Sequence, residues 1–415
     1  MQREQVSKPG ALLVTPIWPA SSGNGLAMRA GLLLRALARD HRVDVWCIPV
    51  SGGSEALPAA RQPSIDRHVV AGLEIDPGWL LATRVGPEAL LRLGRPTACR
   101  FVTHTAVARL HGELDPLDYR YTLVFRSYLL PFVRPIEQSG GSLGFRLVDL
   151  DDDEATTHRR LAELDPTHAA RHRLEAELYE TLEATHLPWA DHLLVAQDEH
   201  AERVRRRLPG LGVDVLPNAV AVPDRSTSWE RPESTEVGAT ALRLLLAGNL
   251  TYLPNRAAAR ELALAIVPRL RSQGLNVRLR LIGRRPSPDV VELGTLDDVE
   301  LLTDVDDLEP HYAWADQVVL PLRAGGGTRI KILEAFASGV PVVTTSMGAD
   351  GLRVRDGEHM LIAETVDELV AASLRLTRSP DLCRSLSESA YDWVRRHHDQ
   401  DGVSHRFADS LEVLA

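Results

Sequence analysis

The chain has 415 residues, of which 44% are hydrophobic and 25% are charged, and its formal net charge is −10. This length exceeds what one hydrophobic core usually serves, so we expect at least two domains. The acidic balance argues against a nucleic-acid-binding protein, because a phosphate backbone requires a basic surface.

Cysteine usage and the lack of long apolar runs indicate the compartment. Cys47, Cys99 and Cys383 are far apart and form no CxxC pair, which favours a reducing environment. The N-terminus lacks the apolar segment of a signal peptide, and no run approaches the ~18 apolar residues of a membrane span. We expect a cytoplasmic protein without a membrane span, and leave peripheral membrane contact and the oligomeric state open.

The first half of the chain is predicted to alternate between strands and helices. Residues 11–15 and 43–50 read as buried strands on either side of a helix over 26–39, which gives a first βαβ unit. The region 154–187 is rich in Glu, Ala, Leu and Arg and predicts one or two long helices. Further strands are expected at 122–125, 145–150, 193–196 and 213–216.

The segment 222–240 interrupts this alternation, since it is polar, contains two prolines and shows no periodicity. We interpret it as a linker between domains. After it a helix is predicted over 257–272, with strands at 242–248, 277–283, 317–322 and 341–345. The expected organisation is an N-terminal domain at 1–221, the linker, a C-terminal domain at 241–397, and a final helix at 398–415 that returns to the N-terminal domain.

Both halves are therefore predicted to be α/β domains of the doubly wound, Rossmann-like kind, with a parallel sheet covered by helices. In such sheets ligands bind outside the carboxyl ends of the strands. Two such domains facing each other would place a ligand cleft between them.

A glycine-rich turn in the second half is the strongest signal for a binding site. The glycines at 325–327 follow an apolar strand and precede a helix predicted from Thr328 to Ser338, and such helix starts bind anions through their backbone N–H groups. Only two of the 47 Lys and Arg residues are lysines, and one of them, Lys331, lies on this helix. The use of lysine at this position, in a chain that otherwise uses arginine, indicates that a compact ammonium is needed there. Glu334 lies one turn further on the same stripe, within reach of a ribose hydroxyl.

A structural interpretation of this segment competes with binding. Gly-rich turns before helices are common, and Lys331 and Glu334 can simply form a solvated ion pair. The apolar neighbours favour binding, since a charged pair among apolar side chains needs a reason. For Arg329 the choice is between a phosphate and water, and the adjacent glycines favour the phosphate.

Four loops at predicted carboxyl ends of strands can line one ligand site. Each loop alone is a weak signal, because short loops between a strand and a helix use glycine for steric reasons. Four of them in register on a two-domain pattern are a stronger signal. They contain Gly23, Asn24 and Gly25; Gly248 and Asn249; Gly283, Arg284 and Arg285; and Gly325, Gly326, Gly327, Thr328 and Arg329.

Two groups of residues raise the question of a metal ion. The acidic run at 149–154 can clamp Mg²⁺ or Mn²⁺, but aspartates also cap the first turn of a following helix, and we favour capping. His168 and His172 are four residues apart, yet no third ligand follows at a motif spacing, which favours a surface pair. No metal site is predicted, and no GxSxG, HExxH or Walker A sequence is present.

Longer motifs resemble those of a known enzyme family, the retaining glycosyltransferases of family four. AGNLTYLPNRAAA (247–259) is similar to the G-x-(M/L)-x-Y-x-P-N-x-x-A signature of one subgroup, and LPLRAGGGTRIKILEAFASGVPVVTTSMGADGL (320–352) is similar to its hallmark. Segments 19–45, 149–155 and 193–220 resemble its opening loop and helix, its acidic element and its exit from the first domain. The resemblance covers nearly the whole chain and implies the GT-B fold of two Rossmann-like domains.

Carried over residue by residue, the resemblance implies a nucleotide-sugar site. Glu334 matches the glutamate that holds the donor ribose. Arg329 and Lys331 would bind the diphosphate and act in catalysis, together with the backbone amides of Gly327 and Thr328. The other implied donor-binding residues are Gly23, Asn24 and Gly25 in the first domain, Gly248, Asn249, Gly325 and Gly326 in the second, and Gly283, Arg284 and Val305 beside the nucleobase.

The sequence departs from the family pattern at three places. Eight residues before Glu334, where many members carry a first glutamate, this chain has Gly326, so other groups must recognise the sugar hydroxyls. The histidine that many members present from a first-domain strand end has no counterpart, and Arg126 is the candidate catalytic residue there. Ala219 replaces the glycine of the PNG motif. No catalytic base is assigned.

The resemblance implies a glycosyltransferase that moves a sugar from a UDP-, GDP- or dTDP-sugar to an acceptor hydroxyl, with retention and without a metal. The acceptor is expected to be a small molecule or a glycan, in natural-product (antibiotic) or surface-polysaccharide biosynthesis. Front-side transfer mainly needs positioning and stabilisation of the leaving diphosphate, so a missing base is tolerable. Two alternatives stay open, a nucleotide-sugar epimerase on the same fold and a nucleotide-binding protein without catalysis.

Overall fold

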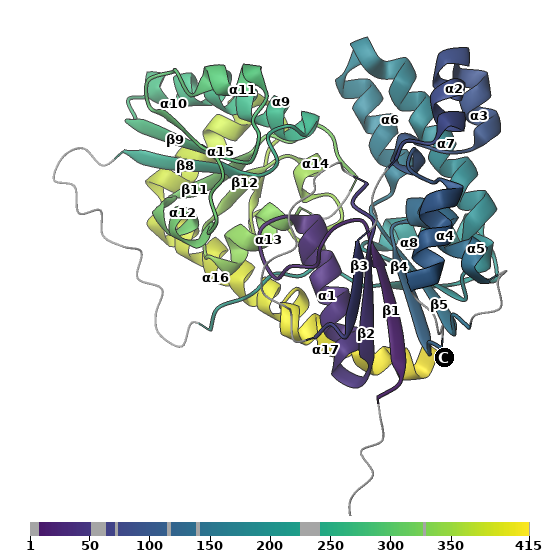
Figure 1. Cartoon of the computed structure of the whole chain (residues 1–415). Helices are drawn as coiled ribbons and strands as arrows, with labels where there is room; N and C mark the ends of the chain where they lie inside the picture. Colours follow the sequence, from purple (N-terminus) through teal and green to yellow (C-terminus); the bar gives the residue numbers. More distant parts are fainter. Residues whose placement is uncertain are drawn as a thin grey trace, which may run out of the picture. The chain divides into compact units, whose positions relative to one another are not determined.

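The computed structural model describes residues 8–50, 64–70, 74–113, 118–137, 142–224, 241–326 and 329–414. The chain divides into two compact units, each with its own parallel sheet (Figure 1). This confirms the predicted α/β class of two doubly wound, Rossmann-like domains. Unit 1 comprises Met1–Ser21, Gly25–Pro217 and Asp401–Ala415, and unit 2 comprises Ser22–Asn24 and Asn218–Gln400.

The sheet of unit 1 has seven strands in the order β3-β2-β1-β4-β5-β6-β7. Every pairing in it is parallel, so the carboxyl ends of the strands lie along one edge. The central strand β4 is buried throughout, as expected for a sheet with helices on both faces. The strands are β1 (Gly10–Thr15), β2 (Arg42–Cys47), β3 (Arg67–Val70), β4 (Tyr121–Phe125), β5 (Phe145–Asp151), β6 (His192–Val195) and β7 (Gly212–Val215).

Nine α-helices are described in unit 1: α1 (Gly25–Asp40), α2 (Pro77–Val85), α3 (Pro87–Leu93), α4 (His104–Glu113), α5 (Leu130–Glu137), α6 (Glu154–Leu164), α7 (Ala169–His186), α8 (Asp198–Arg207) and α17 (Gln400–Leu414). The helix α17 follows unit 2 in the chain but packs in unit 1. Tyr121 Oη donates a hydrogen bond to Leu411 O at 2.9 Å, and Arg39 pairs with Asp409 at 2.6 Å. Both Leu411 and Phe407 are buried.

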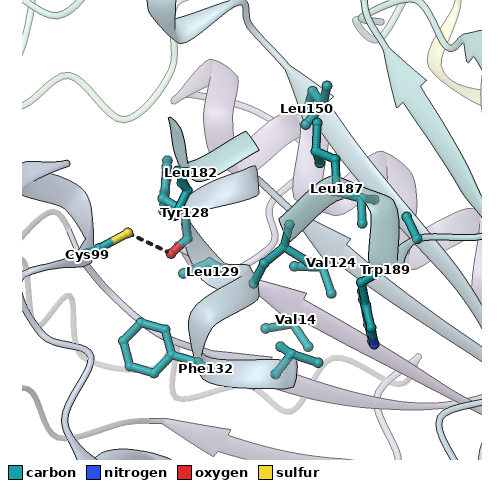
Figure 2. Close-up of a cluster of buried hydrophobic side chains, with 14 of the residues drawn as sticks. Val14, Cys99, Val124, Tyr128, Leu129, Phe132, Leu150, Leu182, Leu187 and Trp189 are labelled. Atoms are coloured by element: carbon teal, nitrogen blue, oxygen red, sulfur yellow. Dashed lines mark hydrogen bonds between the residues drawn. The ribbon is translucent and has the colours of Figure 1, made fainter. Parts of the chain in front are cut away.

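The core of unit 1 lies between its sheet and helices that include α5, α7 and α8. Figure 2 shows the part of it formed by α5, α7 and the neighbouring strands. Val14 and Val124 from the strands contact a cluster that includes Phe132 of α5. Cys99 is fully buried and donates a weak hydrogen bond from Sγ to Tyr128 O at 3.4 Å. Each such apolar side chain stabilises the fold by about 1.5–3 kcal/mol through burial.

The six strands predicted for the first half are present, each within a few residues of its expected bounds. The long helical region consists of two helices, α6 and α7, separated at Pro166. Proline has no backbone N–H, so it cannot donate the hydrogen bond that would continue the helix. The edge strand β3 was not predicted, because its four residues carry no clear alternation. The helices α2 and α3 were also missed.

The sheet of unit 2 has six strands in the order β10-β9-β8-β11-β12-β13, all parallel. The chain runs outward from β8 to β10 on one side and then returns to β11 on the other side of β8. The strand order therefore reverses between β8 and β11, which is where such sheets bind ligands at their carboxyl ends. The strands are β8 (Leu242–Ala247), β9 (Val277–Ile282), β10 (Val299–Leu302), β11 (Gln317–Leu320), β12 (Val342–Thr344) and β13 (Leu361–Ile362).

The described helices of unit 2 are α9 (Leu253–Glu261), α10 (Val267–Ser272), α11 (Pro288–Leu293), α12 (Glu309–Trp314), α13 (Ile330–Ala337), α14 (Ser346–Ala349), α15 (Val366–Arg378) and α16 (Pro380–His397). The helix predicted over 257–272 begins earlier, at Leu253, and widens into a π turn over Leu262–Ile266. This turn precedes Pro268, whose missing N–H interrupts the regular hydrogen-bond ladder. Most of the predicted linker, residues 225–240, lies outside the described residues.

Candidate active site

Lys331 lies at the switch point of unit 2, on the first turn of α13. Its Nζ donates a hydrogen bond to Asn255 Oδ1 on α9 at 2.6 Å. Asn255 is buried, and its Nδ2 donates to Asn249 O in the loop after β8 at 2.8 Å. Burial of the ammonium, with a smaller contribution from the charge of Arg329, lowers the pKa of Lys331 to about 8.

Glu334 lies one turn further along α13 and is held by Tyr312 of α12. Tyr312 Oη donates to Glu334 Oε2 at 3.0 Å and to Lys331 O at 3.3 Å, and the ring of Tyr312 is buried. Burial raises the pKa of Glu334 to about 7, although the Tyr312 hydrogen bond and the Lys331 charge act in the opposite direction. The predicted Lys331–Glu334 stripe is therefore a half-buried arrangement with specific partners.

Arg329 differs from its predicted place. We expected it as the second residue of a helix from Thr328, but the helix begins at Ile330 and Arg329 is the N-cap residue, with φ −83° and ψ 80°. Its guanidinium turns back to donate from Nη2 to Met347 O at 3.1 Å, and it is buried. The fold-back fills the space beside Gly325, where an added Cβ would lie 2.5 Å from Arg329 Nη1.

Two glycines of the predicted loops are required by close approach of other atoms. A Cβ added to Gly283 would clash with Gly248 O and, at 2.6 Å, with Leu250 Cγ, so the loops after β8 and β9 are in contact. A Cβ on Gly248 would meet Asn255 Nδ2 at 3.1 Å and Lys331 Cε at 3.2 Å. Gly248 thus keeps open the space that the Lys331 side chain occupies, and Gly283 allows the two loops to touch.

The other predicted donor-binding residues of unit 2 lie at the same sheet edge. Asn249 fixes its own loop, because its Oδ1 accepts hydrogen bonds from the backbone N and the hydroxyl of Thr251. Arg284 is exposed, Val305 is half-buried and Gly326 is buried. Gly327 and Thr328 lie outside the described residues.

Of the loop predicted for the first domain, Ser22–Asn24 groups with unit 2. Gly23 and Asn24 are exposed, and Gly23 has a positive φ of 91°, which favours glycine. Gly25 is the first residue of α1.

Arg126 lies in unit 1 at the carboxyl end of β4, as predicted, and it is engaged by three carboxylates. Its ion pairs to Asp151, Asp152 and Glu154 measure 3.0, 3.2 and 2.8 Å. Arg126 has a φ of 82° and Asp151 a φ of 55°, conformations that cost about 1–3 kcal/mol each and cluster at functional sites. Burial raises the pKa of Glu154 to about 7. Asp153 caps α6, as we predicted for the acidic run.

A second arginine beside this network was not predicted. Arg29 of α1 is 1% exposed and binds Asp149 through Nε at 2.8 Å and Nη2 at 2.9 Å, while its Nη1 donates to Leu216 O at 2.8 Å. The signal for it was present, because Arg29 interrupts the apolar side of the helix predicted over 26–39. Asn255 lies in the motif at 247–259, but that motif does not indicate its contact with Lys331. Tyr312 gives no comparable signal, because its partners are distant in sequence.

The residues considered for metal binding have protein partners. His168 Nδ1 lies 2.8 Å from Asp165 Oδ2, and His172 Nδ1 lies 3.1 Å from His158 Nδ1. Within the described part of the chain, no group of three or more His, Cys, Asp or Glu side chains has a geometry suited to a metal ion. None of the helices described there is long and apolar enough to cross a membrane.

Comparison with known proteins places the site in a recognised domain. Residues 241–379 match the family model described as glycosyl transferases group 1, so this part of the chain is a glycosyltransferase group 1 domain. The match contains Asn255, Tyr312, Lys331 and Glu334. The particular subgroup suggested by the sequence motifs is not tested by this match.

Solved structures of similar fold cover the whole chain. The sucrose-phosphate synthase of Thermosynechococcus elongatus superimposes with a TM-score of 0.71 over 98% of this chain and 99% of its own, at 15% identity. Anabaena HepE, solved with UDP and glucose, gives a TM-score of 0.62 over 98% and 99%, at 13% identity. These likenesses show that the fold is GT-B.

A curated relative matches only locally. An exopolysaccharide phosphotransferase of Streptomyces coelicolor is 32% identical over 127 residues, which are 29% of this chain and 14% of that protein. The chain thus spans a small fraction of the length of this relative.

Proposed function

We propose that this chain is a glycosyltransferase that moves a sugar from a nucleoside diphosphate, UDP, GDP or dTDP, to an acceptor hydroxyl with retention of configuration. The observation that carries the proposal is the presence, one turn apart on α13, of a half-buried ammonium, Lys331, and a half-buried carboxyl, Glu334, at the switch point of a glycosyltransferase group 1 domain. An ammonium suits a diphosphate and a carboxylate suits ribose hydroxyls. HepE, of similar fold, has been solved with UDP-glucose, which supports this donor class.

In the proposed reaction the protein supplies positioning and electrostatics. Negative charge grows on the diphosphate as the bond to the sugar breaks, and Lys331 and Arg329 stabilise it from fixed positions. The departing phosphate oxygen accepts the proton of the acceptor hydroxyl, so no protein base is required. Arg126 of unit 1 is proposed as a further catalytic residue. Natural-product aglycones and surface-polysaccharide intermediates are the acceptor classes that we propose.

The test of this function is the release of nucleoside diphosphate in the presence of acceptor. A thermal-shift screen of nucleotide sugars first identifies the donor, since a bound ligand raises the melting temperature by mass action. Free nucleoside diphosphate that appears only when an acceptor is added supports a transferase. Conversion of the donor to its epimer would establish the epimerase instead, and binding without turnover on any acceptor would support a non-catalytic protein.

Glu334→Gln is expected to weaken nucleoside diphosphate binding about 10–100-fold, because a hydrogen bond to a charged group contributes about 1.5–3 kcal/mol. The pKa of Glu334 is raised to about 7, so the wild-type carboxyl becomes protonated as the pH falls below 7. The difference in nucleoside diphosphate affinity between the variant and the wild type should therefore be large at pH 8 and small at pH 6. Calorimetry with UDP, GDP and dTDP measures it, with the exposed Glu292→Gln as the matched control. Unchanged affinity at pH 8 would remove Glu334 from the donor site.

We expect transfer to proceed fully in the presence of EDTA, because Arg329 and Lys331 provide the positive charge that a divalent metal would otherwise bring. The rate of nucleoside diphosphate release, with and without chelator, measures this. Activity that is lost in EDTA and restored by Mn²⁺ would contradict a metal-independent mechanism and make Asp151 and Asp153 candidate ligands.

A further inference from the structure

Asn255 is the contact through which the protein holds Lys331. Among the residues that the structure describes, Asn255 Oδ1 is the hydrogen-bond partner of the Lys331 ammonium, at 2.6 Å. An ammonium carries three N–H donors, so this contact leaves two for a ligand. Asn255 comes from α9, whereas Lys331 comes from α13, and the contact therefore joins the loops on the two sides of the switch point.

The orientation of the Asn255 amide follows from its two neighbours. Asn249 O can only accept a hydrogen bond, so the amide must present Nδ2 to it, at 2.8 Å. The Lys331 ammonium can only donate, so it must face Oδ1. The side chain is buried at 4% exposure and Gly248 leaves no side chain between it and Lys331, so this arrangement is fixed from both ends.

An amide at this position has an electrostatic consequence that a carboxylate lacks. It holds the ammonium in place and adds no counter-charge, whereas an aspartate of the same shape would pair with the ammonium and neutralise it. The other charged or titratable groups near Lys331 are Arg329 before the helix, Glu334 on the same helix and Tyr312 on α12. None of them forms an ion pair with Nζ within the described residues.

We propose that Asn255 is a positioning residue that holds the Lys331 ammonium through a neutral acceptor and so keeps its positive charge available to the diphosphate of the donor. This rests on the proposed function, because it assigns that diphosphate to the site. The proposal predicts that two substitutions of Asn255 shift the pKa of Lys331 in opposite directions. Asn255→Asp adds a counter-charge to the ammonium, and Asn255→Ala removes its acceptor.

The titration of Lys331 itself tests the contact without any ligand. Because the chain has only two lysines, selective ¹³C and ¹⁵N labelling of lysine gives two sets of NMR signals, one from Lys331 and one from Lys8. Asn255→Asp should raise the pKa of Lys331 above the wild-type value, and Asn255→Ala should lower it. Lys8, in unit 1, serves as the internal reference and should not change. A Lys331 pKa that is the same in all three proteins would overturn the inference.

Calorimetric titration with UDP, GDP and dTDP then tests the consequence for binding. The affinity of Asn255→Asp should be about 10–100-fold below that of the wild type, because a neutralised ammonium loses a charge-assisted contact. Asn276→Asp is the matched control, since it makes the same chemical change at an exposed residue before β9, on the opposite edge of the sheet. Wild-type affinity in a folded Asn255→Asp protein would overturn the inference.

The two measurements separate the inference from the proposed function. If the wild type binds none of the nucleotides but the pKa of Lys331 responds in opposite directions, the proposed donor site falls and the Asn255 contact stands. If the melting curve shows that Asn255→Asp does not fold, Asn255→Ala tests the inference instead. In Asn255→Ala, a lowered pKa of Lys331 together with weakened UDP binding supports the inference. A Lys331 pKa and a UDP affinity equal to those of the wild type overturn it.

Discussion

Lys331→Ala is expected to lower the turnover number about 10²–10³-fold, the usual loss when one fixed electrostatic group is removed from a developing charge. The affinity for the nucleotide sugar should fall less, because the charge that Lys331 stabilises grows only as the sugar leaves. Steady-state rates of nucleoside diphosphate release, together with donor affinity by calorimetry, separate the two effects. Lys8→Ala, the substitution of the only other lysine, is the control and should leave both unchanged.

Lys331→Arg is expected not to restore this turnover. The ammonium lies against Gly248 and Asn255, where an added Cβ on Gly248 would already be 3.2 Å from Lys331 Cε. A planar guanidinium is wider and cannot take the place of a point charge in this space. An arginine variant with wild-type turnover would show that the retained lysine has no special role.

Arg29→Met is expected to destabilise unit 1 by about 3–5 kcal/mol, because it leaves the buried carboxylate of Asp149 without its partner. The loss should be smaller at acidic pH, where protonation of Asp149 removes the uncompensated charge. The double variant Arg29→Met/Asp149→Leu, which removes both charges, should recover most of the stability.

Hydrogen–deuterium exchange resolved by peptide measures this effect in α1, β4 and β5, and a urea titration gives its size. Arg35→Met is the matched control, since Arg35 lies on the same helix but is half-exposed and its partner Asp401 is exposed. Equal losses for Arg29→Met and Arg35→Met would contradict the assignment of Arg29 to a buried network.

The architecture was largely predictable because its signals are local. Buried parallel strands are continuous apolar runs, so β1, β4, β8 and β11 stand out from the sequence. The edge strands β3 and β13 are only four and two residues long, too short to show a pattern, and their pairing depends on neighbours that are distant in the chain. Sequence spacing also placed the start of α13 too early, because Arg329 leaves the helical conformation to reach Met347 O, which is 18 residues away.

The candidate site was predictable only in part, for the same reason. The glycine turn, Lys331 and Glu334 lie within one short segment, and helical spacing alone puts the two side chains on one stripe. Asn255 is 76 residues from Lys331 and Tyr312 is 22 residues from Glu334, so no local pattern announces these contacts. Local sequence therefore predicts the charged groups, whereas the contacts that hold them join residues far apart in the chain.

The placement of α17 determines the order in which the protein can be completed during translation. This helix belongs to unit 1, through Tyr121 Oη to Leu411 O and the Arg39–Asp409 ion pair, yet it follows all of unit 2 in the chain. A ribosome therefore releases every residue of unit 2 before unit 1 has its last helix. Until then the α17-binding surface of its sheet and of α1 is uncovered, and transiently exposed apolar surface of this kind is prone to aggregation.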